Sequence, residues 1–186
     1  MAVSLVAAVH VSLAGVLLMC LPVVAVLAAA ALPTNHVRRA PVLGTASATL
    51  RSVVPPCIAV VGIMLVAQSG PWVLLVFVLL VSAYDAGNFL IGAEARTPIP
   101  GIIGGIACTV VAGVPLMVSQ LPPFDGRPVG LVFAGLVGVV APLGQMVASL
   151  ALPASHEWVG PLRRIDAYIL TGPLFAWVMA RFLALA

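Results

Sequence analysis

Long runs of apolar residues restrict the folds open to this chain more than any motif does. The first 32 residues contain no charged side chain, and further runs follow at 53–69, 71–91, 101–119, 129–152 and from about 163 to the C-terminus. About 20 apolar residues in a helix cross the hydrocarbon core of a bilayer. Soluble domains have about 25% charged residues, whereas this chain has 7%. We therefore expect an all-α, polytopic membrane bundle of six transmembrane helices, forming a single domain over residues 1–186.

The first run, residues 1–32, has two interpretations. The sequence AAAALP near its end resembles the cleavage site of a secretion signal. However, no basic residue precedes the run, whereas Arg38 and Arg39 follow it, which is the reverse of the charge bias of a signal. We therefore expect this run to be retained as the first membrane helix.

The arginines predict an orientation. The chain has no lysine, and six of its eight arginines lie in the predicted loops 33–52, 92–100 and 153–164. The positive-inside rule places these loops in the cytoplasm, with both termini outside and the protein in the inner (plasma) membrane. Basic residues scattered in this way do not form the clustered patch that nucleic acids require, so we expect no nucleic-acid partner. The six arginines are Arg38, Arg39, Arg51, Arg96, Arg163 and Arg164.

An acidic residue interrupts the run at 71–91. Asp85 lies fourteen residues after Pro71, which places its carboxylate roughly 20 Å along a helix. An ionisable group at such depth costs several kcal/mol unless it is paired, hydrated or bound to a cation. Asn88 and Gly92 follow three and seven residues later, on the same helical face. This face leads into a segment rich in glycine and proline, and the arrangement predicts a functional site.

The stretch 85–92, DAGNFLIG, resembles a segment of the phosphatidate cytidylyltransferases (CDP-diacylglycerol synthases). That segment runs roughly D-T-G-A-Y, two hydrophobic residues, then G-R. The family continues with S-P-x-K-T-x-E-G and a G-G pair, and here Thr97-Pro98 and Gly104-Gly105 stand where this second part begins and ends. The lysine and glutamate of the second part are absent. The glycines at the start of the next run also allow its backbone to approach a neighbouring helix closely.

The C-terminal part continues the resemblance. The stretch 144–149, GQMVAS, keeps the glycine and serine of the family's G-D-hydrophobic-x-x-S segment, but Gln145 replaces the acid. The stretch 160–166, GPLRRID, resembles the signature H-G-G-x-x-D-R-x-D, in which Arg164 and Asp166 match and Arg163 replaces the first aspartate. The K-R and K-D pairs between these segments are missing. The likeness covers residues 50–186 and corresponds to the family's catalytic C-terminal half.

The resemblance implies a reaction of phospholipid metabolism. The family transfers a cytidylyl group from CTP to phosphatidic acid and releases pyrophosphate. Because two anions must meet, divalent cations held by carboxylates neutralise the phosphates. By this likeness Asp85, Asp166 and Arg164 are the catalytic residues, and Asp85 and Asp166 would hold Mg²⁺ if the protein is active.

The same likeness implies residues that bind the substrates, CTP and a phosphatidic-acid-like membrane lipid. These residues combine an amide with basic side chains, which suit phosphate oxygens. They are Asn88, Arg96, His156 and Arg163.

Three functions remain open. In the first, Arg163 or Arg164 forms a buried ion pair with Asp85 or Asp166 in place of a metal, and the chain is a pseudoenzyme or a membrane-complex subunit that works with a partner protein or as a homodimer. In the second, the chain is an active CTP-dependent cytidylyl or phosphoryl transferase acting on a lipid. In the third, it is a transporter or ion-pathway subunit in which Asp85 carries the ion. The missing lysines and acids favour the first.

Overall fold

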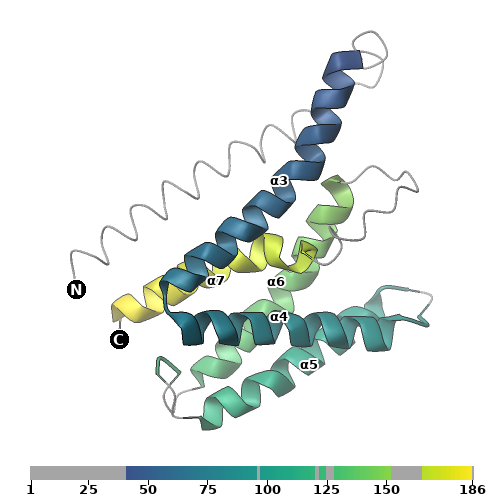
Figure 1. Ribbon diagram of the computed structural model, residues 1–186. Helices are drawn as coiled ribbons and strands as arrows, with labels where there is room; N and C mark the ends of the chain where they lie inside the picture. The colour runs from purple at the N-terminus through teal and green to yellow at the C-terminus, as the bar shows by residue number, and fades with distance from the viewer. Residues whose placement is uncertain (1–40, 96, 120–121, 125–127, 152–164, 186) are drawn as a thin grey trace.

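The computed structural model describes residues 41–95, 97–119, 122–124, 128–151 and 165–185, and these form helices without any strand. Figure 1 shows their course through the molecule. The helices are α3 (Pro41–Gln68), α4 (Pro71–Gly92), α5 (Ile99–Val118), α6 (Val129–Ala151) and α7 (Asp166–Leu185).

Four of the described helices are long and apolar enough to cross a membrane. They are the segments Pro71–Gly92, Ile99–Val118, Val129–Ser149 and Asp166–Ala184. The sequence prediction of a helical membrane protein is therefore confirmed, and the bounds of these four spans agree closely with those expected. The count of six spans is not confirmed. The predicted first helix, residues 1–32, lies outside the described residues, and α3 contributes only a shorter apolar segment, Val54–Gln68.

The predicted polar loop at 33–52 is wrong over its second half. Helix α3 begins at Pro41 and continues through Arg51 and the pair Pro55-Pro56 to Gln68. Proline is well suited to the first turn of a helix, where its missing N–H costs no hydrogen bond. Arg51 is itself a good helix former, and the helix continues through the two internal prolines.

Short turns join the helices in the middle of the chain. Gly70 adopts a φ of 124° between α3 and α4, a conformation that favours glycine. The amides of Ser69 and Gly70 donate to the carbonyls of Val66 and Ala67 at 3.0 and 3.1 Å, and Pro71 then opens α4. Ser69, Gly70 and Pro71 thus form the turn that separates α3 from α4.

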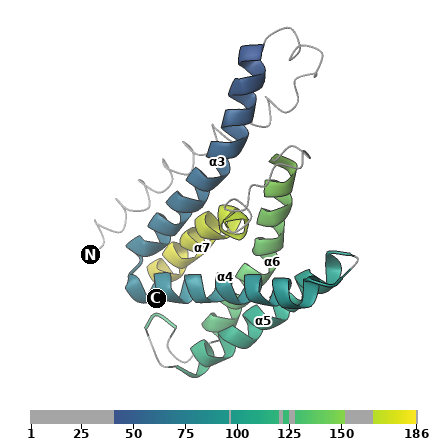
Figure 2. The ribbon, with the colours of Figure 1, turned by 45° about the vertical axis from the view of Figure 1, so that its right-hand side comes forward.

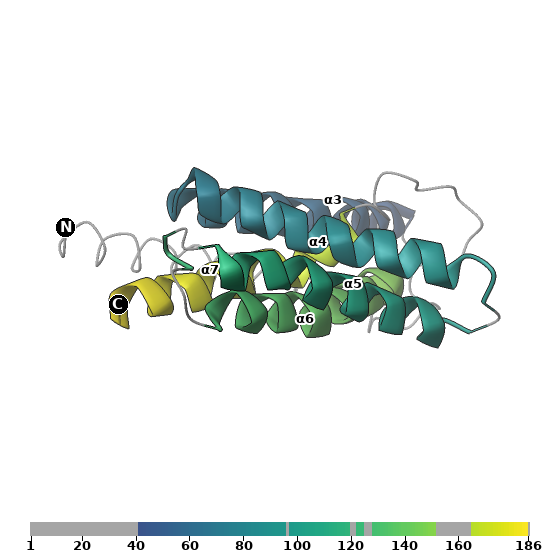
Figure 3. The same ribbon diagram turned by 90° about the horizontal axis from the view of Figure 1, so that it is seen from below.

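The helices form one bundle in which α7 lies between α3 and α6. Helices α4 and α5 form an antiparallel hairpin, α6 packs on α5 and α7, and α7 also packs along α3 (Figures 1 and 2). Seen from below, α3 and α4 lie on one side of the bundle and α5 and α6 on the other (Figure 3). Helix α4 contacts α3, α6 and α7 in addition to α5, its partner in the hairpin.

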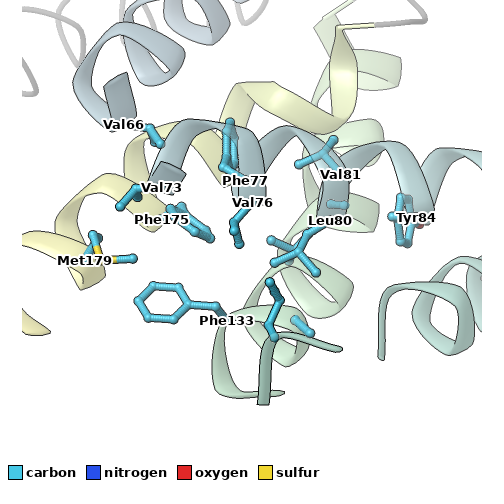
Figure 4. Packing of buried hydrophobic residues seen from close by; sticks show 14 of the residues in the cluster. Val66, Val73, Val76, Phe77, Leu80, Val81, Tyr84, Phe133, Phe175 and Met179 are labelled. Atoms are coloured by element: carbon cyan, nitrogen blue, oxygen red, sulfur yellow. The ribbon is translucent and has the colours of Figure 1, made fainter. Parts of the chain in front are cut away.

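Aromatic side chains fill the centre of the bundle (Figure 4). Phe175 of α7 lies between Phe77 of α4 and Phe133 of α6, with ring centroids 4.9 and 4.7 Å apart. All three side chains are almost completely buried. Large apolar side chains elsewhere, such as Phe89 and Val118, are more than 70% exposed. In a membrane this apolar surface faces lipid chains, so its exposure carries no penalty.

Glycines set the distance between α4 and α5. A Cβ atom added to Gly105 would lie 2.6 Å from the Tyr84 ring, and one added to Gly104 would lie 2.6 Å from Ile91 Cδ1. A Cβ on Gly101 would overlap the side-chain oxygen of Asn88. The expectation that these glycines permit close approach to a neighbour is confirmed, and α4 is that neighbour.

Candidate functional site

Polar side chains of α4 and α6 meet inside the bundle. Gln145 of α6 accepts hydrogen bonds through Oε1 from the Tyr84 hydroxyl at 3.4 Å and from Asn88 Nδ2 at 3.2 Å. Tyr84 is fully buried and Asn88 is half-buried. One glutamine oxygen therefore joins two positions of α4, one helical turn apart, to α6.

Asn88 also lies against the third helix of this group. Its Oδ1 occupies the space that a side chain at Gly101 of α5 would need. Gly92, on the same face of α4, lies against Gly101 as well, because a Cβ on Gly92 would be 3.1 Å from Gly101 Cα. The backbone at Gly92, on the face where the sequence predicted a functional site, is therefore occupied by helix packing.

Asp166 enters the cluster from the first residue of α7. Its Oδ1 accepts a hydrogen bond from the Ala167 amide at 2.7 Å, which satisfies one of the free N–H groups of a helix start. Its backbone lies against α6, because a Cβ on Gly144 would be 2.7 Å from the Asp166 carbonyl oxygen. Gly144 thus allows α7 to begin directly beside Gln145.

Asp85 and Asp166 lie within electrostatic range of each other. They come from different helices and are separated by 81 positions in the sequence, so only the packing of α4 with α7 brings them together. Two like charges in a region of low dielectric repel each other strongly. The arrangement therefore requires positive charge, hydrogen-bond donors, water or a proton bound to one of the carboxylates.

Two further hydroxyl groups border the carboxylates. Tyr168 of α7 lies near Ser82 of α4 and within electrostatic range of Asp85. Its ring also meets Phe77 edge-on, with centroids 5.7 Å apart. Tyr168 therefore connects the polar cluster with the aromatic core.

Ser82, Tyr84 and Tyr168 were not among the site residues predicted from the sequence. Tyrosine and serine in an apolar run give no signal of their own. Their spacing from the two aspartates was the available indication that they belong to the site. Ser82 and Tyr84 are close neighbours of Asp85, and Tyr168 follows Asp166 by two residues. Their connection to one cluster depends on how α4 and α7 cross.

The structure brings together three of the predicted site residues, Asp85, Asn88 and Asp166. The other predicted residues lie outside the described part of the chain, so their positions remain predictions. These are Arg96, His156, Arg163 and Arg164. Within the described residues no group of three or more His, Cys, Asp or Glu side chains is placed to hold a metal ion. Asp85 and Asp166 are the carboxylates that lie within electrostatic range of each other across α4 and α7.

The cluster lies inside the predicted membrane region. Helix α4 has 22 residues and rises roughly 33 Å, close to the thickness of about 30 Å of a hydrocarbon core. Asp85 precedes the last residue of α4, Gly92, by seven positions, or roughly 10 Å. The fold and the site together define a polytopic helical membrane protein with a half-buried acidic cluster near one end of its bundle. Comparisons with protein-family models, with curated proteins and with solved structures gave no match.

Proposed function

We propose that this chain is a non-catalytic membrane protein of the phosphatidate cytidylyltransferase type, which serves as a subunit of a membrane complex. Its relation to that family rests on the order and spacing of the sequence segments described above. Its lack of catalysis is inferred from the losses within those segments and from the role of Gln145 in the bundle.

The hydrogen bonds of Gln145 carry the proposal. By the resemblance, this position holds an acid in the cytidylyltransferases. Here the side chain is a neutral amide whose oxygen accepts from Tyr84 and Asn88. An amide oxygen engaged by two donors adds no negative charge to a cation site, whereas it satisfies polar groups inside the membrane. The change from acid to amide therefore favours a role in joining helices.

The small number of charged groups also supports the proposal that the chain is not catalytic. Cytidylyl transfer brings a triphosphate to a lipid phosphate, so catalysis depends largely on cations that neutralise both. The chain has no lysine. Two aspartates on different helices could hold one Mg²⁺ with water and substrate completing its shell, but they are a poor basis for two ions. Arg163, where the family has an aspartate, would repel a cation further.

The proposal is tested by an activity assay on the purified full-length chain in detergent and lipid. We expect no CDP-diacylglycerol from CTP, Mg²⁺ and phosphatidic acid, under conditions in which an authentic cytidylyltransferase is active. Asp85→Asn serves as the matched control. Product that forms with the native chain and disappears with Asp85→Asn would overturn the proposal.

The active enzyme is the second candidate, and a specific observation favours it. Asp85 and Asp166, which the resemblance designates as metal ligands, do lie within electrostatic range of each other. A transferase with a single Mg²⁺ would place the ion between these carboxylates. The same assay decides between the two functions, since this candidate predicts turnover that requires both aspartates.

A partner chain is part of the proposal. A non-catalytic subunit acts through the proteins that it contacts, and either a different membrane protein or a second copy of this chain would serve. Cross-linking of the full-length chain in its native membrane should then give a discrete species of higher mass. Cross-linking that yields monomer alone would contradict the complex without restoring the enzyme.

A further inference from the structure

A second feature lies at the opposite end of the bundle from the acidic cluster. There α4 begins and α7 approaches its end, and Figure 4 shows Val73 of α4 close to Met179 of α7. Two tryptophans on these helices point outwards, since Trp72 is 57% exposed and Trp177 is 54% exposed. Exposed tryptophans at the same end of neighbouring membrane helices are typical of the boundary between hydrocarbon and headgroups.

Arg181 adds a charge to this boundary. Its guanidinium lies 5.8 Å from the centre of the Trp177 ring, one helical turn away on α7. Arg181 is exposed, and no carboxylate within the described part of the chain pairs with it. A bare guanidinium facing lipid chains is costly, so its long side chain must reach an anion or water.

The length of the helices shows which anion is in reach. Helix α4 matches the hydrocarbon thickness, and Trp72 is its second residue. Because Val73 of α4 and Met179 of α7 belong to one buried cluster and lie close together in Figure 4, Arg181 lies near the end of the bundle at which α4 begins. Lipid phosphates are the anions present at that depth in every phospholipid bilayer. Guanidinium binds phosphate oxygens with two parallel hydrogen bonds.

We propose that Trp72, Trp177 and Arg181 form a binding site for the phosphate of a membrane phospholipid at the end of the bundle opposite the acidic cluster. The cation–π contact with Trp177 holds the guanidinium against the helix surface, and the two indole rings lie among the lipid carbonyls. This site is independent of the proposed function, because it uses none of the cluster residues.

Fluorescence quenching tests the depth of the site. A full-length variant with Trp72→Phe and Trp158→Phe retains Trp177 as its single tryptophan and is reconstituted in phosphatidylcholine vesicles. The lipid carries bromine either near the headgroup or near the chain end. We expect stronger quenching by the shallow bromine, and a lower ratio of shallow to deep quenching in Arg181→Leu but not in Arg181→Lys. Deeper quenching of the parent, or a ratio that Arg181→Leu does not change, would overturn the proposal.

Mass spectrometry of the intact chain in neutral detergent tests the ligand. Phosphatidylglycerol and diacylglycerol are added separately, because phosphatidylglycerol carries a phosphate and diacylglycerol does not. We expect the native chain to retain phosphatidylglycerol in preference to diacylglycerol, and Arg181→Gln to reduce that retention severalfold. Equal retention of the two lipids, or equal retention by the native chain and Arg181→Gln, would contradict a phosphate site.

Discussion

Replacing Gly87 with alanine should separate α4 from α5. The added Cβ would overlap the carbonyl oxygen of Gly104 and lie 2.7 Å from Cys108 Sγ and 2.8 Å from Cys108 Cβ. Ordinary contact begins at 3.4 Å, and the nearest atom belongs to the backbone, so the helices must move apart. Overpacking of this kind costs about 1–3 kcal/mol, and the better helix propensity of alanine returns up to about 1 kcal/mol. We expect Gly87→Ala to lower the free energy of unfolding by about 1–2 kcal/mol.

Gly135→Ala is the matched control. Gly135 lies within α6, and a Cβ there would meet no atom within 4 Å. Alanine at this position should leave the free energy of unfolding unchanged or raise it by up to about 1 kcal/mol. Both variants are measured by reversible unfolding of the full chain in bicelles. Free energies for the two variants that agree within roughly 0.3 kcal/mol, the additivity error of such measurements, would refute the close helix contact.

Three further predictions follow from the cluster and the sequence. A double-mutant cycle of Asn88→Ala and Gln145→Ala should give a coupling energy of about 0.6 kcal/mol, with about 1.7 kcal/mol as the upper bound seen in membrane proteins. The cycle of Tyr84→Phe with Gln145→Ala should give a smaller coupling energy, because the Tyr84–Gln145 hydrogen bond is longer. A larger coupling energy for the Tyr84 cycle would contradict the geometry. Asp85→Ala should destabilise the protein by several kcal/mol if Arg163 or Arg164 pairs with it, and adding Arg163→Ala should recover part of the loss, whereas strictly additive effects for both arginines would exclude the pair. Cysteines introduced at 33–52 should resist labelling from outside intact cells, and successful labelling would reverse the predicted orientation.

Much of the helical architecture could be predicted from the sequence because bilayer thickness imposes a length on apolar runs. The turn at Gly70 and the close packing of α5 on α4 were predictable because both depend on glycine. Gly70 adopts a positive φ, and the glycines of α5 lie where α4 leaves no space for a Cβ. The start of α3 was not predictable from polarity. Helix formers after Pro41 maintain the helix regardless of whether the bilayer surrounds them.

The candidate site was predictable in its acids but not in its arrangement. Asp85 stood out because an isolated carboxylate in an apolar run is costly. Gln145 was recognisable as a replacement for an acid, yet nothing local indicates that its oxygen accepts from Tyr84 and Asn88. Those contacts depend on the crossing of α4 and α6. Tyr168 likewise lies near Ser82 only through the packing of α7 against α4.

The central claim is that the acidic cluster of this chain joins helices and does not bind nucleotide with Mg²⁺. The most direct measurement is the unfolding free energy of the full-length chain during a titration with CTP and Mg²⁺. A ligand that binds the folded state raises this free energy by about 2.7 kcal/mol at one hundred times its dissociation constant. We predict no change at millimolar CTP and Mg²⁺. A rise that Asp85→Asn or Asp166→Asn abolishes would contradict the account and identify a functional nucleotide site.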